Sequence, residues 1–328
     1  MGIRHVLAYQ NNPTIDVVAG CDLRREARTA FSERFRGARS YEDWHEMLDK
    51  EDLDVVSVVT YASSHPDITI ATARSGVPRI ICEKPMATSL RDAHEMAQTC
   101  HEKKVRLAVN HSRRWSGAYR RLRRAIQGGV IGHLSNISCT CGGGQLACNG
   151  SHFLDLMRML SGSEPSLVAG FLDARGTPNP RGPQFEDPGA FGLIRFSNGV
   201  RGFIDMYEDL GVPPKIEIVG SIGRVSIEET LGSWTVLTRR TADRDQPITR
   251  YDLPLEPYPF EGDALDVVQL LGRTIDEILT DGPISCTGED GIASLEMVMA
   301  FHVSHGMNNS FVRLPLEKKY RDLEVNFT

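Results

Sequence analysis

The chain has 328 residues, the length of about two domains. Hydrophobic residues make up 41% and charged residues 24%, as in an ordinary globular protein. A net charge of −6 gives little support to a nucleic-acid partner, and no apolar run reaches the ~20 residues that a membrane helix needs. The seven cysteines are scattered without a C-x-x-C pair, and no signal peptide is recognisable, so we expect reduced thiols in the cytoplasm.

The first half of the chain alternates short apolar runs with helical patterns. Strands are predicted at 15–21, 53–60, 79–83 and 105–110. Helices are predicted at 24–36, at 41–49 with Ser40 as N-cap, at 66–75 before Gly76, and at 89–103. Strands separated by helices of about ten residues indicate parallel βαβ units. The fold class of this half is therefore α/β, with a parallel sheet of the Rossmann type.

The pattern changes from about residue 130. Two hairpins are predicted, with turns at 197–199 and 220–223, and further strands at 234–238 and 249–253. Helices predicted at 150–161, 263–280 and 288–304 would cover one face of a mostly antiparallel sheet. The Pro- and Gly-rich segment 171–189 is predicted to be a mobile loop near the domain cleft. The expected domains are 1–115 and 116–328.

Glu83-Lys84-Pro85 is the most informative short segment. It follows the apolar run Arg79-Ile80-Ile81-Cys82 and precedes a helical pattern, so Lys84 stands at the end of a strand. Ligands of open α/β sheets bind outside the carboxyl ends of the strands. A lysine held there by its neighbours can serve in acid–base or hydrogen-bonding work, although Glu-Lys pairs are also common on solvated surfaces.

Six segments in this order resemble one family, the Gfo/Idh/MocA family of nicotinamide-dependent oxidoreductases. The segments are Thr60-Tyr61-Ala62-Ser63-Ser64-His65, Ile81-Cys82-Glu83-Lys84-Pro85-Met86-Ala87, Asn110-His111-Ser112-Arg113-Arg114-Trp115, Gly150-Ser151-His152-Phe153-Leu154-Asp155, Phe196-Ser197-Asn198-Gly199 and Gly288-Glu289-Asp290-Gly291. The resemblance covers nearly the whole chain. It implies a dinucleotide-binding first domain and an α+β second domain, with an open antiparallel sheet, that binds substrate and forms oligomers.

The resemblance also implies roles for individual residues. Lys84 would lie beside the nicotinamide and the substrate hydroxyl, and His152 would be the proton-transfer group. An imidazole titrates near neutral pH, and an ammonium stabilises a developing alkoxide. Contacts to the cofactor are expected from Gly2, Asp22, Arg24, Thr60, His65, Glu83, Lys84, Asn110 and Arg114, and contacts to the substrate from Lys84, Asn149, His152 and Asp155.

Two of these assignments have structural alternatives. On sequence alone, His152 reads more readily as a helix histidine packed against the sheet, and only the motif around it favours a catalytic role. Asp155 lies one turn after His152 on the same helix face. It would either orient the substrate or pair with Arg158, and the sequence leaves both open.

The chain departs from the family pattern four residues before His152. The family commonly has an acidic residue there, and this chain has Cys148 followed by Asn149. A thiol cannot hold the other imidazole nitrogen as a carboxylate does, although Asn149 could supply part of that function. Cys139, Cys141, Cys148 and His152 could converge as soft ligands, but their spacing matches no standard zinc site, so no metal is predicted.

The start of the chain is also unusual for this class. A dinucleotide domain begins with a strand and a G-x-G-x-x-G turn, whereas Met1 and Gly2 resemble the end of that turn and the helix after it. The absent strand would be central in the 3-2-1-4-5-6 order. About ten ladder bonds at ~1 kcal/mol each would be lost, which rivals the stability of a domain. This comparison favours a start codon assigned too late over a natural truncation.

Asp22 ends the second expected strand of the class, where a carboxylate pairs with a ribose hydroxyl and repels a 2′-phosphate. NAD is therefore the predicted cofactor, with NADP as the alternative because Arg24 and Arg25 are close by. The predicted activity is hydride transfer between NAD(P) and a secondary alcohol of a sugar, cyclitol or related polyol. A sugar- or nucleotide-sensing or degenerate paralogue is the alternative. A homodimer or homotetramer through the second-domain sheet is expected, with no nucleic-acid or membrane partner.

Overall fold

The N-terminal part of the chain folds into two small parallel sheets. The computed structural model describes residues 1–173, 175–176 and 178–327. In the first sheet, β1 (Ala19–Cys21) pairs with β2 (Arg39–Tyr41), and the second has the order β3 (Val56–Val58), β4 (Arg79–Cys82), β5 (Arg106–Val109). The helices of this part are α1 (Gly2–Gln10), α2 (Arg25–Arg34), α3 (Trp44–Lys50), α4 (His65–Ser75) and α5 (Leu90–Glu102). The predicted parallel pairing is confirmed.

Several predicted boundaries in this part were wrong. β1 includes only the last three residues of the predicted strand 15–21. Tyr41 belongs to β2, and α3 begins after Asp43, whose carboxylate accepts a hydrogen bond from the His45 backbone N–H. That capping bond, and not one from Ser40, sets the start of the helix. Ser89 caps α5 as Asp92 N–H donates to its hydroxyl, and Gly76 ends α4 with a φ of 98°.

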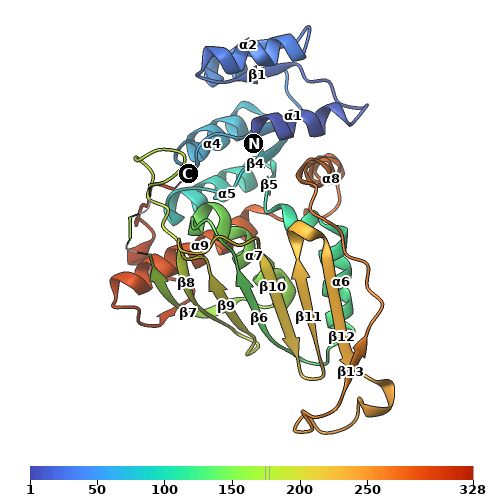
Figure 1. Cartoon of the computed structure of the whole chain (residues 1–328). Helices are drawn as coiled ribbons and strands as arrows, with labels where there is room; N and C mark the ends of the chain where they lie inside the picture. The colour runs from blue at the N-terminus through green and yellow to red at the C-terminus, as the bar shows by residue number, and fades with distance from the viewer. Residues whose placement is uncertain (174, 177, 328) are drawn as a thin grey trace.

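The two parallel sheets are not joined by a strand among the described residues. Helix α1 lies between them in the view of Figure 1. His5 Nδ1 and Tyr9 Oη of α1 both lie within hydrogen-bond distance of Ser57 Oγ on β3, at 3.1 and 2.6 Å. The single sheet expected for the first half is therefore divided into a β1–β2 sheet and a β3–β4–β5 sheet, and the Ser57 side chain of β3 hydrogen-bonds to polar side chains of α1.

The second part is built on a nine-stranded sheet with the order β13-β12-β11-β10-β6-β9-β8-β7-β14. Its strands are β6 (Leu134–Thr140), β7 (Pro165–Leu172), β8 (Ala190–Phe196), β9 (Arg201–Asp205), β10 (Lys215–Gly220), β11 (Gly223–Glu228), β12 (Ser233–Arg239), β13 (Leu255–Pro257) and β14 (Val312–Arg313). Both predicted hairpins are confirmed as β8–β9 and β10–β11. The predicted strand 249–253 was wrong, because those residues form turns before β13.

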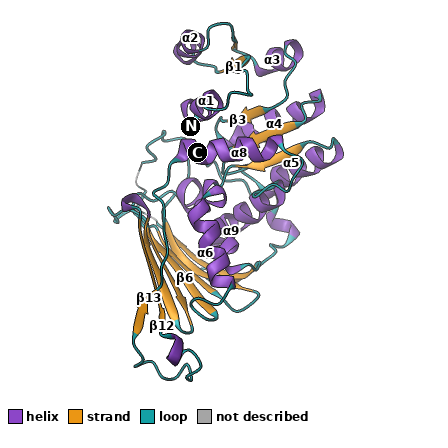
Figure 2. Cartoon of the chain, turned by 90° about the vertical axis from the view of Figure 1, so that its right-hand side faces the viewer, coloured by secondary structure: helices purple, strands orange, loops and turns teal. Residues whose placement is uncertain are grey.

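Helices cover only one face of this sheet, as Figure 2 shows. They include α6 (Gly117–Gln127), α7 (Ser151–Ser161) and α9 (Gly288–Gly306). Gly170 and Gly192 make room for the Phe301 ring of α9, since a Cβ at either position would lie within 3 Å of it. Helix α9 can therefore approach the sheet closely.

The C-terminal chain returns to the N-terminal part. Helix α8 (Val267–Leu279) packs on α1, and Asn12 Nδ2 donates to Asp276 Oδ1 at 2.9 Å. Val109 N–H of β5 donates to the Cys286 carbonyl. The domain division at 115/116 stays a prediction, but these contacts tie the two parts together across it. No helix among the described residues is long and apolar enough to cross a membrane.

Candidate active site

Two consecutive residues at the end of β4, Glu83 and Lys84, have different partners. Ile80, Ile81 and Cys82 are fully buried, so the strand is held in place up to Glu83. The Glu83 carboxylate is also buried and lies 2.7 Å from both His5 Nε2 and Asn110 Nδ2.

Lys84, the next residue, is half-buried and reaches the second part of the chain. Its ammonium donates to the Cys148 carbonyl and lies 3.6 Å from Cys148 Sγ. Glu83 therefore braces α1 and the end of β5, while Lys84 contacts the segment just before α7.

Glu83 predicts a pH-dependent contribution to stability. Burial would raise its pKa, but the His5 and Asn110 hydrogen bonds and the charges of His5 and Lys84 outweigh burial and lower it to about 2. A depressed carboxyl pKa stabilises the fold above the unfolded pKa of 4.5, by roughly 3 kcal/mol, and this contribution is lost as pH falls from about 4.5 to 2. Glu83→Gln should therefore lower the urea midpoint at pH 7, and the difference from wild type should shrink below pH 4.5. An equal difference at pH 3.5 and pH 7 would contradict this role.

His152 stands in the first turn of α7 and lacks a partner for one nitrogen. Its Nδ1 is buried without a hydrogen-bond partner, as expected with Cys148 in place of an acidic residue. The His111 ring packs edge-on against it, with 5.8 Å between centroids. Burial, and then the positive charges of Lys84 and Arg113, lower the His152 pKa well below its ordinary value. The imidazole is therefore neutral at pH 7, with a lone pair on one ring nitrogen.

Asp155 pairs with Arg114 and not with Arg158. Its carboxylate is fully buried and lies 2.8 Å from both Nε and Nη2 of Arg114. Arg158 pairs instead with Glu164 and Asp290. Of the two alternatives for Asp155, pairing with Arg158 was thus wrong, and Asp155 and Arg114 form a buried ion pair with each other. This geometry favours a supporting role for each over direct contact with substrate or cofactor.

Apart from Gly2, the remaining predicted cofactor residues lie around the ends of β1, β3 and β5. Asp22 follows β1 and accepts hydrogen bonds from Arg24 backbone N–H and guanidinium. His65 nitrogens lie 3.1 Å from the Thr60 and Pro85 carbonyl oxygens, so this ring joins the loops after β3 and β4. Asn110 Oδ1 is buried without a protein partner. Gly2 is exposed in the first turn of α1, and nothing lies within 4 Å of an added Cβ.

Sequence reasoning missed a buried carboxylate next to the Lys84 contact. Asp187 is 6% exposed and accepts hydrogen bonds from the backbone N–H groups of Ala147 and Cys148. It lies in the segment predicted as a mobile loop, where residues 174 and 177 are outside the described part. Phe185 of this segment packs on Tyr61 of the N-terminal part, with 4.8 Å between centroids. An acid in a Pro- and Gly-rich loop carries no local signal for such a contact.

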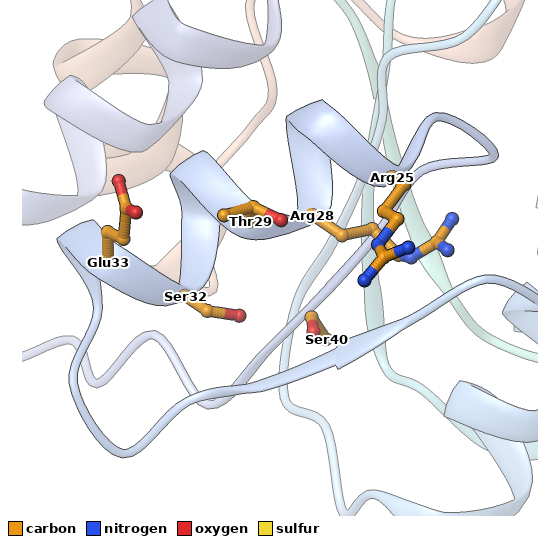
Figure 3. A pocket seen from close by; sticks show the side chains of 6 residues that line it. All are labelled: Arg25, Arg28, Thr29, Ser32, Glu33 and Ser40. Carbon is orange, nitrogen blue, oxygen red and sulfur yellow. The ribbon is translucent and has the colours of Figure 1, made fainter.

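The cysteines considered for zinc do not gather with His152 among the described residues. The group that does come together is His111, Asp155 and Cys286. Because the Arg114 guanidinium already pairs with Asp155, it takes the position that a metal ion would need beside this carboxylate. A surface hollow beside α2, shown in Figure 3, is lined by residues that include Arg25, Arg28 and Ser40 and by none of the predicted site residues.

Comparison with known proteins decides the family. The model described as "Oxidoreductase family, NAD-binding Rossmann fold" (GFO_IDH_MocA) matches residues 1–111, and "Oxidoreductase family, C-terminal alpha/beta domain" matches residues 140–310. The second match alone spans more than half of the chain. The chain belongs to the Gfo/Idh/MocA oxidoreductase family.

Individual relatives agree with this assignment. D-apiose dehydrogenase of Paraburkholderia graminis is 28% identical over 92% of this chain and 84% of its own. Myo-inositol 2-dehydrogenase of Thermotoga maritima is 25% identical over 84% of each chain. An oxidoreductase domain protein from Kribbella flavida has the same fold, with a TM-score of 0.81, 20% identity and 96% coverage of both chains.

Membership of the Gfo/Idh/MocA family confirms three predictions: the two-part α/β fold, an oxidoreductase activity, and NAD as the cofactor. The site is suited to NAD in its own chemistry. Asn110 Oδ1 is a buried acceptor without a protein partner beside the end of β5, and Asp22 presents a carboxylate at the end of β1. The roles of the individual site residues stay predictions.

Proposed function

We propose that this Gfo/Idh/MocA protein transfers a hydride between NAD and a secondary alcohol of a sugar or cyclitol. The relatives named as apiose and inositol dehydrogenases support this substrate class. The observation that carries the proposal is the approach of Lys84 to the turn preceding His152. The Lys84 ammonium bonds the Cys148 carbonyl one helical turn before His152, and its charge lowers the His152 pKa.

In this proposal His152 is the general base of oxidation. Its neutral ring takes the hydroxyl proton. The Lys84 ammonium keeps one N–H on the Cys148 carbonyl and donates another to the substrate oxygen, where negative charge develops. Bound NAD would supply the hydride acceptor for the carbinol carbon. In reduction the same groups act in reverse: His152 returns the proton to the oxygen.

The neighbouring residues have proposed supporting roles. Asn149 is half-buried beside Cys148, and we propose that it contacts a further hydroxyl of the substrate. Asn110, Thr60 and Gly2 would contact NAD. The Asp22 carboxylate would release Arg24 and bind the hydroxyls of the adenosine ribose. Because Arg24 is exposed and could bind a 2′-phosphate, NADP stays the alternative cofactor.

A spectrophotometric assay tests the proposed function. Purified protein is mixed with NAD and, one at a time, D-apiose, myo-inositol and related polyols, and absorbance at 340 nm is followed. We expect turnover with at least one substrate of this class. NADH binding by fluorescence without turnover of any polyol, in either direction, would favour the ligand-sensing alternative instead.

We also propose that the open face of the nine-stranded sheet contacts a second copy of the chain. Phe191, Leu193 and Phe203 are each between 37% and 40% exposed there, and Leu193 lies directly opposite Phe203. Arg195 lies opposite Arg201 at one end of this apolar strip, an unfavourable like-charge pair unless an external group neutralises it. Asp205 lies at the other end of β9, so a copy related by a two-fold axis would place acid against base.

A charge placed on this strip should separate the copies. In Phe203→Lys, two lysines would be buried near the two-fold axis of a dimer, so light scattering should show a monomer where wild type shows a dimer or tetramer. Thr235→Lys, on β12 of the same sheet but separated from β9 by three strands, is the matched control; Thr235 is exposed, and the variant should keep the wild-type mass. A monomeric wild type would contradict the proposal. The compartment proposed for the protein is the cytoplasm, in keeping with its seven free thiols.

A further inference from the structure

Asp187 and Lys84 hold the same short turn from two sides. The turn is η3 (Leu146–Gly150), a π-helical segment directly before α7. The Asp187 carboxylate accepts from Ala147 N at 2.7 Å and from Cys148 N at 2.9 Å. The Lys84 ammonium donates to the Cys148 carbonyl. N–H and carbonyl groups of a helical turn point toward opposite ends, so the carboxylate anchors the turn whose carbonyl receives the ammonium.

We propose that Asp187 is a positioning residue for Lys84. Asp187 orients the Cys148 carbonyl that binds the Lys84 ammonium, and its carboxylate supplies the negative charge that residue 148 lacks. This inference rests on the proposed function, in which Lys84 contacts the substrate oxygen. A thiol at position 148 leaves the ammonium without a carboxylate on η3 itself. Asp187 comes from a segment 39 residues away and restores that charge through the backbone.

The Asp187 segment is held by both parts of the chain. Phe185 packs on Tyr61, in the loop after β3, and Glu186 N–H donates to the Asn326 carbonyl at 2.9 Å. These contacts hold the segment from outside η3, in addition to the bond from Leu146 N–H of η3 to the Pro188 carbonyl. The Asp187 carboxylate can therefore help to fix η3.

The surroundings of Asp187 also give it a distinct titration. Burial raises its pKa to about 6, against the hydrogen bonds from Ala147 and Cys148 and the charges of Lys84 and Arg181. The charged and titratable groups that face it are Lys84 from the loop after β4, Cys148 from η3 and Arg181 from its own loop. As pH falls below about 6 the carboxylate takes up a proton, so its charge opposite Lys84 disappears.

The pH profile of kcat/KM in the substrate-oxidising direction tests the inference. Wild type should lose rate through an acid limb near pH 6. Asp187→Asn should lower kcat by about 10- to 100-fold at pH 7.5, the scale of a ~1 Å misplacement, and should lack the limb near pH 6. Its KM for NAD should stay near the wild-type value. A wild-type profile without a limb between pH 5 and 7, or an Asp187→Asn profile parallel to wild type, would overturn the inference.

Asp173→Asn is the matched control. Asp173 is also 6% exposed, lies in the same loop and accepts backbone hydrogen bonds from Arg175 and Glu208 N–H groups, but pairs with Arg175 instead of facing Lys84. Its loss should leave the acid limb in place. An equal fall in kcat and loss of the limb in Asp173→Asn would show that any damage to the loop has this effect, and would refute a specific role for Asp187.

Two further measurements cover folding and the dependence on the proposed function. Cys148→Asp combined with Asp187→Asn returns a carboxylate to η3 and should recover at least tenfold of the lost kcat, which a general loop defect would not allow. A crystal structure of Asp187→Asn should show that the hydrogen bond from the Lys84 ammonium to the Cys148 carbonyl is lost. If this hydrogen bond is intact, the inference is wrong. Because this readout needs no turnover, an inactive wild type would reject the proposed function alone.

Discussion

Lys84→Met should lower kcat for polyol oxidation by about 10²–10⁴-fold while the protein still folds and binds NADH. Methionine keeps most of the lysine stem but removes the ammonium that would stabilise the developing alkoxide. Folding should survive because Lys84 is only half-buried and its hydrogen bonds are with Cys148. Single-substrate kinetics at 340 nm and NADH fluorescence measure the two effects.

Lys103→Met is the control for Lys84→Met, because Lys103 is exposed at the C-terminal end of α5, whereas Lys84 lies in the loop before the N-terminal end of that helix. It should match wild type in kcat and in thermal midpoint. Near-normal kcat in Lys84→Met would remove Lys84 from the catalytic machinery. A large fall in NADH affinity, with kcat unchanged at saturation, would make Lys84 a cofactor-binding residue only.

Asp155→Asn should destabilise the protein by about 3–5 kcal/mol, the largest effect on stability that we expect from a single substitution in the site. It leaves the buried Arg114 guanidinium facing a neutral amide, and removing one partner of a buried ion pair leaves an uncompensated charge. Asp290, 3.2 Å from Arg114 Nη1, keeps the loss toward the lower end of that range. Urea unfolding followed by tryptophan fluorescence measures the change.

The same variant separates the two roles predicted for Asp155. If Asp155 is purely structural, the folded Asp155→Asn protein should keep nearly the wild-type KM for the polyol. If Asp155 contacts the substrate, KM for the polyol should rise. Asp49→Asn, exposed on α3, is the control for the substitution itself and should change stability by less than about 0.5 kcal/mol. Wild-type stability in Asp155→Asn would contradict the buried-pair account.

The sequence predicted the elements whose signal is local. β4 and β5 are apolar runs bounded by polar residues, and α4 and α5 have a capping residue or a glycine at the expected end. The placement of Lys84 at the end of β4 follows from that pattern alone. β2 was missed because its three residues, Arg39–Tyr41, have no apolar alternation and pair only with β1.

The contacts that tune the site are long-range and could not be predicted in this way. Lys84 and Cys148 are 64 residues apart, and Arg114 and Asp155 are 41 apart. Asp155 and Arg158 have the spacing of a helical ion pair. The Asp155 carboxylate pairs instead with Arg114, because the buried Arg114 guanidinium is shielded from water and needs a protein anion to offset its charge. Local spacing therefore identified the charged groups but not their partners.

Strand periodicity, turn residues and the order of six motifs are properties of neighbouring residues, so the two-part architecture and the position of Glu83-Lys84-Pro85 follow from the sequence. The tertiary structure decided what surrounds that lysine. It brought Cys148 to the ammonium, left His152 Nδ1 without a partner, and placed the Asp187 carboxylate behind the turn. These outcomes depend on packing between distant segments, where burial and charge compensation select the partners and local pattern carries no information.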